Sequence, residues 1–234
     1  VASLIDSMTA AAISYVKIHS DRFSSEPEKK SNVVFIDIGD ISMNIAVASL
    51  SKRSIEIKGF ATDKTISGQF FTKQLEEFLL KKVQEKYKID PKTNKRAMIR
   101  FRQAAEKVKK ALSANSIIMF EVPSLMNDID VSIPVKRDEF NELIQNRIEK
   151  VETTIEEALK NSNILKEDVS SIEILGGGSR MPIIKAKIKE FFGCEPMMSL
   201  DLDECFAIGA GYMAAKADGY DIGIDTISSI YPYD

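Results

Sequence analysis

The stretch from Ser171 to Lys187 constrains the fold of this chain more than any other part of the sequence. An apolar run at Ile172–Leu175 is typical of a buried strand, and three glycines, Gly176–Gly178, follow it directly. Ser179 is a suitable helix N-cap, and Pro182 suits the first turn of a helix. A strand, a glycine turn and a helix N-terminus together form a place where backbone N–H groups can bind an anion. The alternative is a tight βα connection whose glycines only permit the turn.

The remaining elements predict an α/β protein in two parts. Three β-like runs, which we expect to form a meander, lie at Val33–Ile38, Ile41–Leu50 and Ser54–Thr62. Apolar spacing also predicts a helix at Leu4–Tyr15, helices at Phe70–Lys88 and Asp90–Leu112, strands at Ile117–Val122 and Ile129–Val135, one long helix at Arg137–Asn161, and a closing helix at Asp203–Lys216. This order predicts one subdomain from residues 1–66 and 145–216, with residues 67–144 inserted into it. From Ala217 the spacing changes, so residues 217–234 are predicted to be a linker.

Composition argues against several classes of function. A net charge of −3 gives no reason to expect a nucleic acid or an anionic membrane as partner, and no apolar run is long enough to span a bilayer. Cys194 and Cys205 lack metal-ligand spacing, so we expect reduced thiols in a reducing compartment. The single histidine, His19, argues against histidine-dependent acid–base catalysis and against a zinc site. The chain begins at Val1 inside a helical pattern, and we expect it to be a piece of a longer protein.

A second turn with the potential to bind an anion lies upstream, at Asp37–Asn44. An acidic residue at a strand end, followed by Gly39 and then by Ser42, can form a hairpin whose backbone N–H groups hold phosphate oxygens. The Asp37 carboxylate would then face a hydrated Mg²⁺ ion or an attacking water. Taken singly, Asp-x-Gly is also a common β-turn.

One face of a predicted helix carries a further set of polar groups. Glu106 is followed at offsets of three, four and seven residues by Lys109, Lys110 and Ser113, so that all four can meet one ligand. The alternative is a solvated, ion-paired surface. The acidic pair Asp203-Glu204, where the closing helix is expected to begin, can likewise serve only to complement the helix dipole.

Taken together, these stretches resemble lobe II of the nucleotide-binding domain of the seventy-kilodalton (DnaK-type) heat-shock chaperones, which belongs to the actin-like ATPase superfamily. The matching segments, in unbroken order, are TAAAISY at Thr9–Tyr15, FIDIG at Phe35–Gly39, AAEKVKKALSA at Ala104–Ala114, LGGGSRMP at Leu175–Pro182 and DECFAIGAG at Asp203–Gly211. The resemblance implies an α/β actin-like ATPase (ribonuclease H-like) lobe with an inserted α+β subdomain. Residues 67–144 would be the inserted, IIB-like subdomain, and residues 1–66 and 145–216 the IIA-like core.

The resemblance also implies a site for ATP or ADP with Mg²⁺. The family's second phosphate loop falls on Gly39, Asp40, Ile41 and Ser42, and its catalytic, Mg²⁺-facing carboxylate falls on Asp37. The adenosine-binding helix face falls on Glu106, Lys109, Lys110 and Ser113, and the turn over base and ribose falls on Gly177, Gly178, Ser179 and Arg180. The Arg180 guanidinium would stack on the adenine, and Asp203 would face the nucleotide from the last helix.

Departures from the family pattern resemble the larger, hundred-and-ten-kilodalton (Sse-type) branch, whose members act as nucleotide-exchange factors. Two of the usual three loop glycines are replaced by Asp40 and Ile41, and Asp40 brings negative charge close to the expected phosphates. An ion-coordinating aspartate is replaced by Asn44, and an expected Glu-Pro pair by Ser7-Met8. The segments KKALSAN and LMNDIDVS, and the tail ending in Ile-Tyr-Pro-Tyr, resemble that branch as well.

We therefore expect the C-terminal lobe of the ATP-binding domain of an exchange-factor-type heat-shock chaperone, a co-chaperone in protein folding and the stress response. The lobe alone should not hydrolyse ATP, and the full-length protein should be a weak ATPase at most. Expected partners are the nucleotide-binding domain of a DnaK-type chaperone and the protein's own lobe I and substrate-binding domain. The alternatives are an active foldase ATPase of the same family, an actin-superfamily sugar kinase, and an interaction module that binds no nucleotide. The expected compartment is the cytoplasm, with the endoplasmic-reticulum lumen as the alternative.

Overall fold

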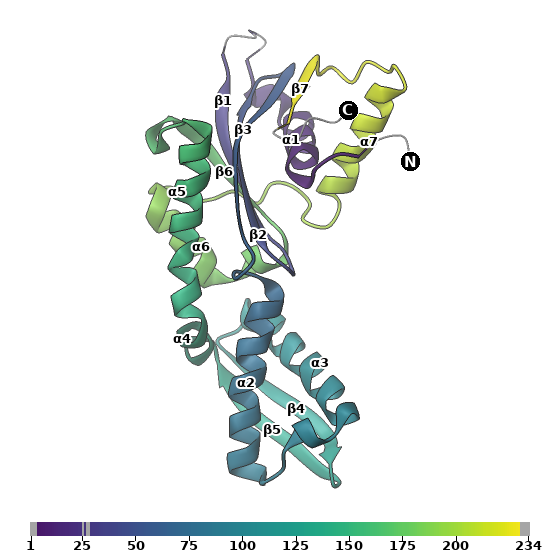
Figure 1. The fold of residues 1–234 in the computed structure, drawn as a ribbon, viewed down its shortest axis with the longest axis vertical. Helices are drawn as coiled ribbons and strands as arrows, with labels where there is room; N and C mark the ends of the chain where they lie inside the picture. The colour runs from purple at the N-terminus through teal and green to yellow at the C-terminus, as the bar shows by residue number, and fades with distance from the viewer. Residues whose placement is uncertain (1–3, 25, 27–28, 230–234) are drawn as a thin grey trace.

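A mixed five-stranded sheet forms the centre of the upper half of the molecule (Figure 1). The computed structural model describes residues 4–24, 26 and 29–229. The strands are β1 (Ser31–Ile38), β2 (Met43–Leu50), β3 (Ser54–Asp63), β6 (Val169–Leu175) and β7 (Thr226–Ser228), in the order β6-β1-β2-β3-β7. The first three strands are an antiparallel meander, β6 is parallel to β1, and β7 is parallel to β3. The predicted meander and the predicted mixed α/β class are therefore confirmed.

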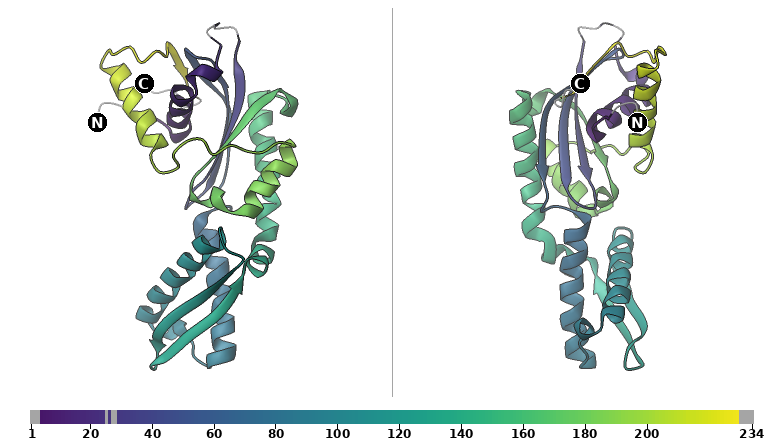
Figure 2. Two further views of the ribbon diagram at one scale, coloured as in Figure 1. Left: turned by 180° about the vertical axis from the view of Figure 1, so that it is seen from behind. Right: turned by 45° about the vertical axis from the view of Figure 1, so that its right-hand side comes forward.

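Helices cover both faces of this sheet (Figure 2). The helices α1 (Ser7–Ile18) and α7 (Cys205–Ala217) pack together on one face, and α5 (Lys150–Ser162) and α6 (Pro182–Phe192) lie on the other. The alternation of the strands sends Val33 and Phe35 into the core with α1, and Val34 and Ile36 into the core on the opposite face. No helix among the described residues has both the length and the apolar character that crossing a membrane requires.

The lower half of the molecule consists of residues between β3 and α5 (Figure 1). Its elements are α2 (Gly68–Tyr87), α3 (Lys95–Leu112), β4 (Ile117–Met126), β5 (Ile129–Lys136) and α4 (Arg137–Ile148), and β4 and β5 form a separate antiparallel sheet. The apolar core continues without a break from Ile38 of the large sheet to Phe71, Phe101 and Phe120 of this half. The two halves therefore share one core, and the predicted boundary at residues 67–144 stays a prediction.

Among the predicted helices, two differ most from the structure, one by a division and one by a later start. The single helix expected at Arg137–Asn161 is divided at Glu149, where the chain passes from the lower half to the layer of α5. The helix expected to begin at Asp90 begins instead at Lys95, since two caps occur in succession. Asp90 caps a short 3₁₀ turn, and the Asn94 side chain then accepts the N–H groups of the first turn of α3.

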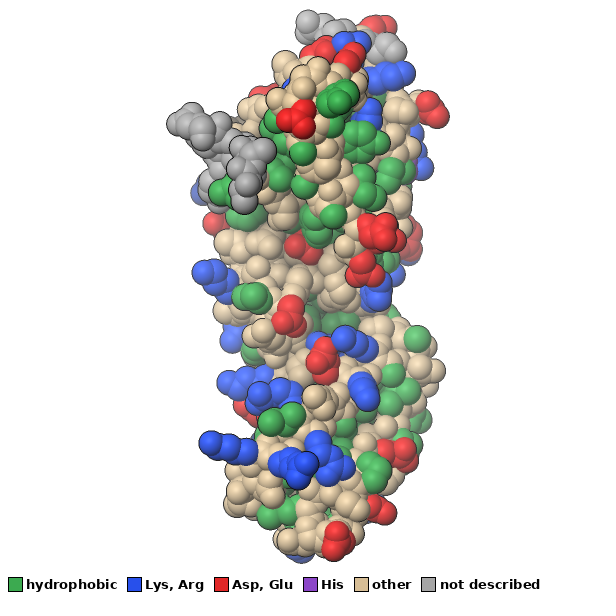
Figure 3. All heavy atoms as spheres, turned by 90° about the vertical axis from the view of Figure 1, so that its right-hand side faces the viewer, with side chains coloured by type: hydrophobic (Ala, Val, Ile, Leu, Met, Phe, Trp, Pro, Cys, Tyr) green, Lys and Arg blue, Asp and Glu red, His purple; other side chains and the backbone are tan. Residues whose placement is uncertain are grey.

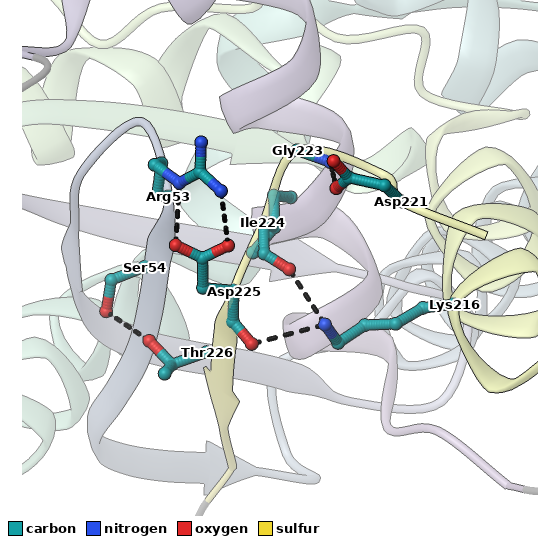
Figure 4. A network of polar contacts seen from close by, with 8 residues as sticks. All are labelled: Arg53, Ser54, Lys216, Asp221, Gly223, Ile224, Asp225 and Thr226. Atoms are coloured by element: carbon teal, nitrogen blue, oxygen red, sulfur yellow. Dashed lines mark hydrogen bonds and ion pairs between the residues drawn. The ribbon is translucent and has the colours of Figure 1, made fainter. Parts of the chain in front are cut away.

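The segment after α7 was predicted to be a linker, but its described part packs against the domain. Ile222 and Ile224 are buried, and β7 pairs with β3. The Arg53 guanidinium donates to both carboxylate oxygens of Asp225, at 2.6 and 2.7 Å, and Lys216 Nζ donates to the carbonyls of Ile224 and Asp225 (Figure 4). Ile222 and Ile224 are separated by one residue and flanked by Gly and Asp, so they are too few to establish a helical or strand periodicity. The packing of this segment against the domain was therefore not predictable from the sequence. Residues 230–234 of the predicted linker lie outside the described residues.

A partly buried polar cluster joins the end of α1 to the sheet. His19 Nε2 lies 2.7 Å from Ser199 Oγ, which donates to Glu173 Oε2 at 2.8 Å. The other Glu173 oxygen accepts the backbone N–H groups of Ser199 and Leu200, at 2.6 and 2.9 Å. Glu173 is fully buried on β6, and these bonds satisfy its carboxylate there.

Candidate functional site

A cavity of about 390 Å³ lies where the two halves of the molecule meet. It is lined by Gly39, Asp40, Gly68, Phe71, Glu106, Lys109, Lys110, Ser113, Gly177, Gly178, Arg180 and Met181. Four segments that are far apart in the sequence therefore converge: the upstream turn (residues 39–42), the start of α2, one face of α3, and the downstream glycine turn (residues 176–180). Most of the residues predicted from the sequence as a nucleotide site lie on this one cavity.

The downstream glycine turn follows β6 and is shaped by close contact with β1. Gly176 has φ +76°, and a Cβ there would lie 2.3 Å from Asp37 Oδ1 and 2.5 Å from the Ile38 carbonyl oxygen. A Cβ at Gly178 would lie 2.5 Å from Ile38 Cγ2. A Cβ at Gly177, in contrast, would meet no described atom within 4 Å. The first and third glycines are thus required by packing, whereas the second borders open space in the cavity.

Ser179 supports this turn from inside. Its side chain is fully buried, and its hydroxyl donates to the Gly176 carbonyl at 2.6 Å. The N-cap of α6 is Met181, so the prediction that Ser179 caps this helix is wrong. The hydroxyl is occupied within the turn and does not line the cavity.

The upstream turn connects β1 to β2. The Gly39 N–H donates to the Ser42 carbonyl at 3.0 Å, which closes the turn. Gly39 and Asp40 line the cavity, but the Ile41 side chain is 69% exposed and lies outside it. The Ser42 hydroxyl lies 3.2 Å from the Asn44 side-chain nitrogen and also lies outside the cavity. The turn therefore borders the cavity through Gly39 and Asp40 only.

Asp37 stands at the end of β1, between the two turns. It pairs with Asn44 across the β1–β2 ladder, and its carboxylate lies beside Gly176. Burial raises the pKa of the Asp37 carboxyl, and the neighbouring Asn44 amide acts in the opposite direction.

The described residues contain no group of three or more His, Cys, Asp or Glu side chains that could hold a metal ion by themselves. Mg²⁺ is commonly held by one or two carboxylates together with waters and substrate phosphates. With Asp37 as the single protein carboxylate, the site would hold Mg²⁺ only together with waters and substrate phosphates.

The α3 face carries an ion pair and a half-buried lysine. Lys110 Nζ lies 2.7 Å from Glu106 Oε1, and this bond is the main cause that lowers the pKa of Glu106. Lys109 Nζ donates to the Gly68 carbonyl at 3.0 Å and to Thr72 Oγ1 at 2.8 Å, both on α2. Burial lowers the pKa of Lys109. The four predicted residues of this face, which end with Ser113, therefore do share one surface of the cavity.

Arg180 and Asp203 face each other at the rim. Arg180 lines the cavity, and its Nη2 lies 3.9 Å from Asp203 Oδ2, with both side chains exposed. The closing helix begins at Cys205 and not at Asp203 as expected, because Asp201 Oδ1 accepts the N–H groups of Asp203 and Glu204 in a turn before the helix. Asp203 itself does not line the cavity.

Three lining residues were missed by the sequence reasoning. Phe71 and Met181 supply apolar surface, and Gly68 supplies the carbonyl that Lys109 binds. Phe71 stood on the apolar stripe of a helix, where its pattern predicted core packing only, and it is indeed fully buried. The arrangement combines an apolar floor, an arginine plane, a carboxylate with two ammonium groups, and backbone turns. This set suits a ligand with a flat ring, a polar middle and an anionic end.

Comparison with known proteins gives matches along nearly the whole chain. The model of the family described as Hsp70 protein matches residues 1–226. The heat shock protein hsp88 of Neurospora crassa and a heat shock protein homolog of Saccharomyces cerevisiae are each 37% identical over 212 residues, which is 91% of this chain and 30% of those proteins. The heat shock 70 kDa protein 4 of Canis lupus familiaris is 32% identical over 232 residues, 98% of this chain and 28% of that protein. The chain thus spans less than a third of the length of these relatives.

Proposed function

Because this chain belongs to the Hsp70 family, as its resemblance to the DnaK-type and Sse-type chaperones predicted, we propose that it forms one side of the ATP-binding site of an exchange-factor-type chaperone. The family has the actin-like ATPase fold, and we assign the ribonuclease H-like part to the five-stranded sheet and the inserted subdomain to residues 67–144. The observation that carries the proposal is the single cavity on which α3, Arg180 and both turns converge.

In this proposal each wall of the cavity binds one part of the nucleotide. Glu106, Lys110 and Ser113 hold the ribose and the polar edge of the base from α3, and Arg180 stacks its guanidinium on the adenine ring. Gly177 leaves room for the ring, since it lines the cavity and carries no side chain. The upstream turn at residues 39–42 lies on the phosphate side.

Asp37 is the proposed Mg²⁺-facing carboxylate. When bound, Mg²⁺ would neutralise charge on the phosphate oxygens. The chain's own contribution is to keep this carboxylate half-buried beside Gly176, so that burial disfavours the charged side chain until a cation is present.

The exchange-factor role rests on the departures at Ser7, Asp40, Ile41 and Asn44. The Asn44 amide carries no charge, and its oxygen accepts a hydrogen bond from Thr62 Oγ1 at 2.9 Å. The proposed partners are the nucleotide-binding domain of a DnaK-type chaperone and the protein's own lobe I and substrate-binding domain. Free thiols at Cys194 and Cys205 suit the cytoplasm.

The site is tested by titrating ATP onto the full-length protein and its Arg180→Ala variant. Loss of a stacked cation–π contact should weaken binding by roughly 1–2 kcal/mol, or about tenfold. Lys107→Ala is the control, because Lys107 is likewise an exposed cation, lies on α3, which borders the cavity, and does not line the cavity itself. Equal affinities for Arg180→Ala and Lys107→Ala would remove Arg180 from the site.

The exchange-factor role is tested separately by measuring ADP release from a DnaK-type chaperone. Adding the full-length protein with ATP should accelerate that release, while its own ATP turnover stays well below that of a DnaK-type foldase measured alongside. Turnover as fast as the foldase, without accelerated release, would favour the active-foldase alternative.

A further inference from the structure

Three hydrogen bonds join the upstream turn to the first residues of α2. The Gly68 N–H donates to the Gly39 carbonyl, and the Gln69 N–H donates to the Asp40 carbonyl, each at 2.9 Å. The side-chain amide of Gln69 also donates to Asp40 Oδ2 at 2.9 Å. We call these contacts the turn-to-helix joint. The Asp40 side chain is thus engaged by α2, the first helix of the lower half.

The geometry around Asp40 favours this position of its carboxylate. A carboxylate at the N-terminus of a helix is stabilised by the helix dipole, and the N-terminus of α2 begins at Gly68. A Cβ at Gly68 would lie 3.0 Å from Asp40 Oδ1, so the glycine permits the close approach. Glycine at position 40, the usual residue of the resembled phosphate loop, would leave the Gln69 amide without this partner.

Lys109 extends the joint to α3. Its ammonium group donates to the Gly68 carbonyl and to Thr72 Oγ1, and so binds the same turn of α2 from the other side. The Asp40 charge acts on Lys109 and favours its protonated form, against the stronger effect of burial. Figure 3 shows lysines and arginines gathered over this half of the molecule, but Lys109 is bound inward, on the cavity.

From these contacts we infer that Asp40 is a positioning residue of the nucleotide site. By binding Gln69 it holds α2, and through Lys109 also α3, against the upstream turn. The adenosine-binding face of α3 then keeps its place over the turn, and a bound nucleotide leaves slowly. The effect on release rests on the proposed function, whereas the joint itself does not.

Three variants of the full-length protein separate the hydrogen bond from the charge. Asp40→Gly and Gln69→Leu remove the side-chain bond, while Asp40→Asn keeps an acceptor oxygen and removes the charge. Without nucleotide, amide hydrogen exchange of residues 68–72 should quicken by about threefold in the first two, the effect expected from one exposed hydrogen bond. Asp40→Asn loses only the attraction between the charge and the helix N-terminus, so these amides should exchange more slowly in it than in Asp40→Gly. The double variant Asp40→Gly/Gln69→Leu should add nothing to either single change, because both remove the same bond.

The consequence for the site is measured as the release rate of ADP carrying a fluorescent group. Asp40→Gly and Gln69→Leu should release it faster by a similar factor, and Asp40→Asn, which keeps the acceptor oxygen, should release it more slowly than either. Release from Asp40→Asn as fast as from Asp40→Gly would overturn the inference in favour of a purely electrostatic role. Unchanged hydrogen exchange in Gln69→Leu would also overturn it. If the unmodified protein binds no ADP, the proposed function is wrong. The hydrogen-exchange rates then still test whether Asp40 holds α2 through the turn-to-helix joint.

Discussion

The two turns that border the cavity are held in place by different interactions. The downstream turn is fixed by steric exclusion, since Gly176 and Gly178 press against the end of β1 with no space for a Cβ. The upstream turn is fixed by hydrogen bonds to α2 and accepts side chains at Asp40 and Ile41. Gly176 and Gly178 of the downstream turn are therefore required for the fold itself, with or without a nucleotide. The upstream turn has room for side chains, because Ile41 is exposed to solvent and the Asp40 carboxylate binds Gln69 of α2.

The strongest way to break the downstream turn is Gly176→Ala. The new side chain meets Asp37 and the Ile38 backbone in a left-handed conformation, so both strain and overlap oppose it. We expect a loss of about 3 kcal/mol or more in the free energy of unfolding, measured by urea denaturation. A loss below about 1 kcal/mol would show that this turn is no more rigid than the upstream one.

Asp37→Asn tests the group that stands between the two turns. Burial raises the pKa of Asp37 above its ordinary value of 3.8, so the folded state binds this proton more tightly than the unfolded state. Its ionised form therefore lowers stability at pH 7, and stability is regained as the pH falls through the folded-state pKa. Asp37→Asn should raise the free energy of unfolding at pH 7, and the gain should shrink toward pH 3.8. A loss at pH 7 would mean that the carboxylate is stabilised by its surroundings.

Gly39→Ala is the corresponding change in the upstream turn. A Cβ at Gly39 would have its nearest neighbour, the Ser42 carbonyl oxygen, at an ordinary distance of 3.5 Å. Because alanine restricts the unfolded chain, we expect a change within about 1 kcal/mol, in the stabilising direction. Urea denaturation beside Gly176→Ala measures the contrast directly, and similar losses in both variants would abolish it.

Gly177→Ala sharpens the comparison within the downstream turn itself. Its Cβ has open space around it, so the free energy of unfolding should hardly change. Because Gly177 lines the cavity, however, we expect the added methyl group to weaken ATP binding to the full-length protein. Unchanged ATP affinity would place the base away from this turn.

Much of this architecture was predictable, because it depends on local pattern. The strand-glycine-helix order at residues 172–188 and the spacing of Glu106, Lys109, Lys110 and Ser113 are visible in the sequence, and the predicted family is confirmed. Each motif alone was ambiguous, but the order of the motifs along the chain identified the family.

The unpredicted parts depend on contacts between distant segments. Whether Ser179 caps a helix or binds its own turn depends on how closely the turn approaches Ile38, which no local pattern records. The docking of the tail depends on contacts with distant segments, among them the pairing of β7 with β3 and the ion pair of Asp225 with Arg53, 172 residues away in the sequence. The sequence predicts that Asp40 lies near the phosphates. Its contact with Gln69 was not predictable, because the position of α2 relative to this turn depends on tertiary packing.

The cluster around His19 supplies a built-in spectroscopic reporter. Since the chain has one histidine, its imidazole gives a single set of ring signals in a nuclear magnetic resonance spectrum. Burial is the main cause that lowers the pKa of His19, Arg22 acts in the same direction, and Glu173 opposes both. The ring signals should therefore titrate below pH 6.5, and the stability of the fold should decline as the pH falls through that range. Because the ring contacts Ser199 and Tyr15, any movement of α1 against β6 would shift these signals without an added label.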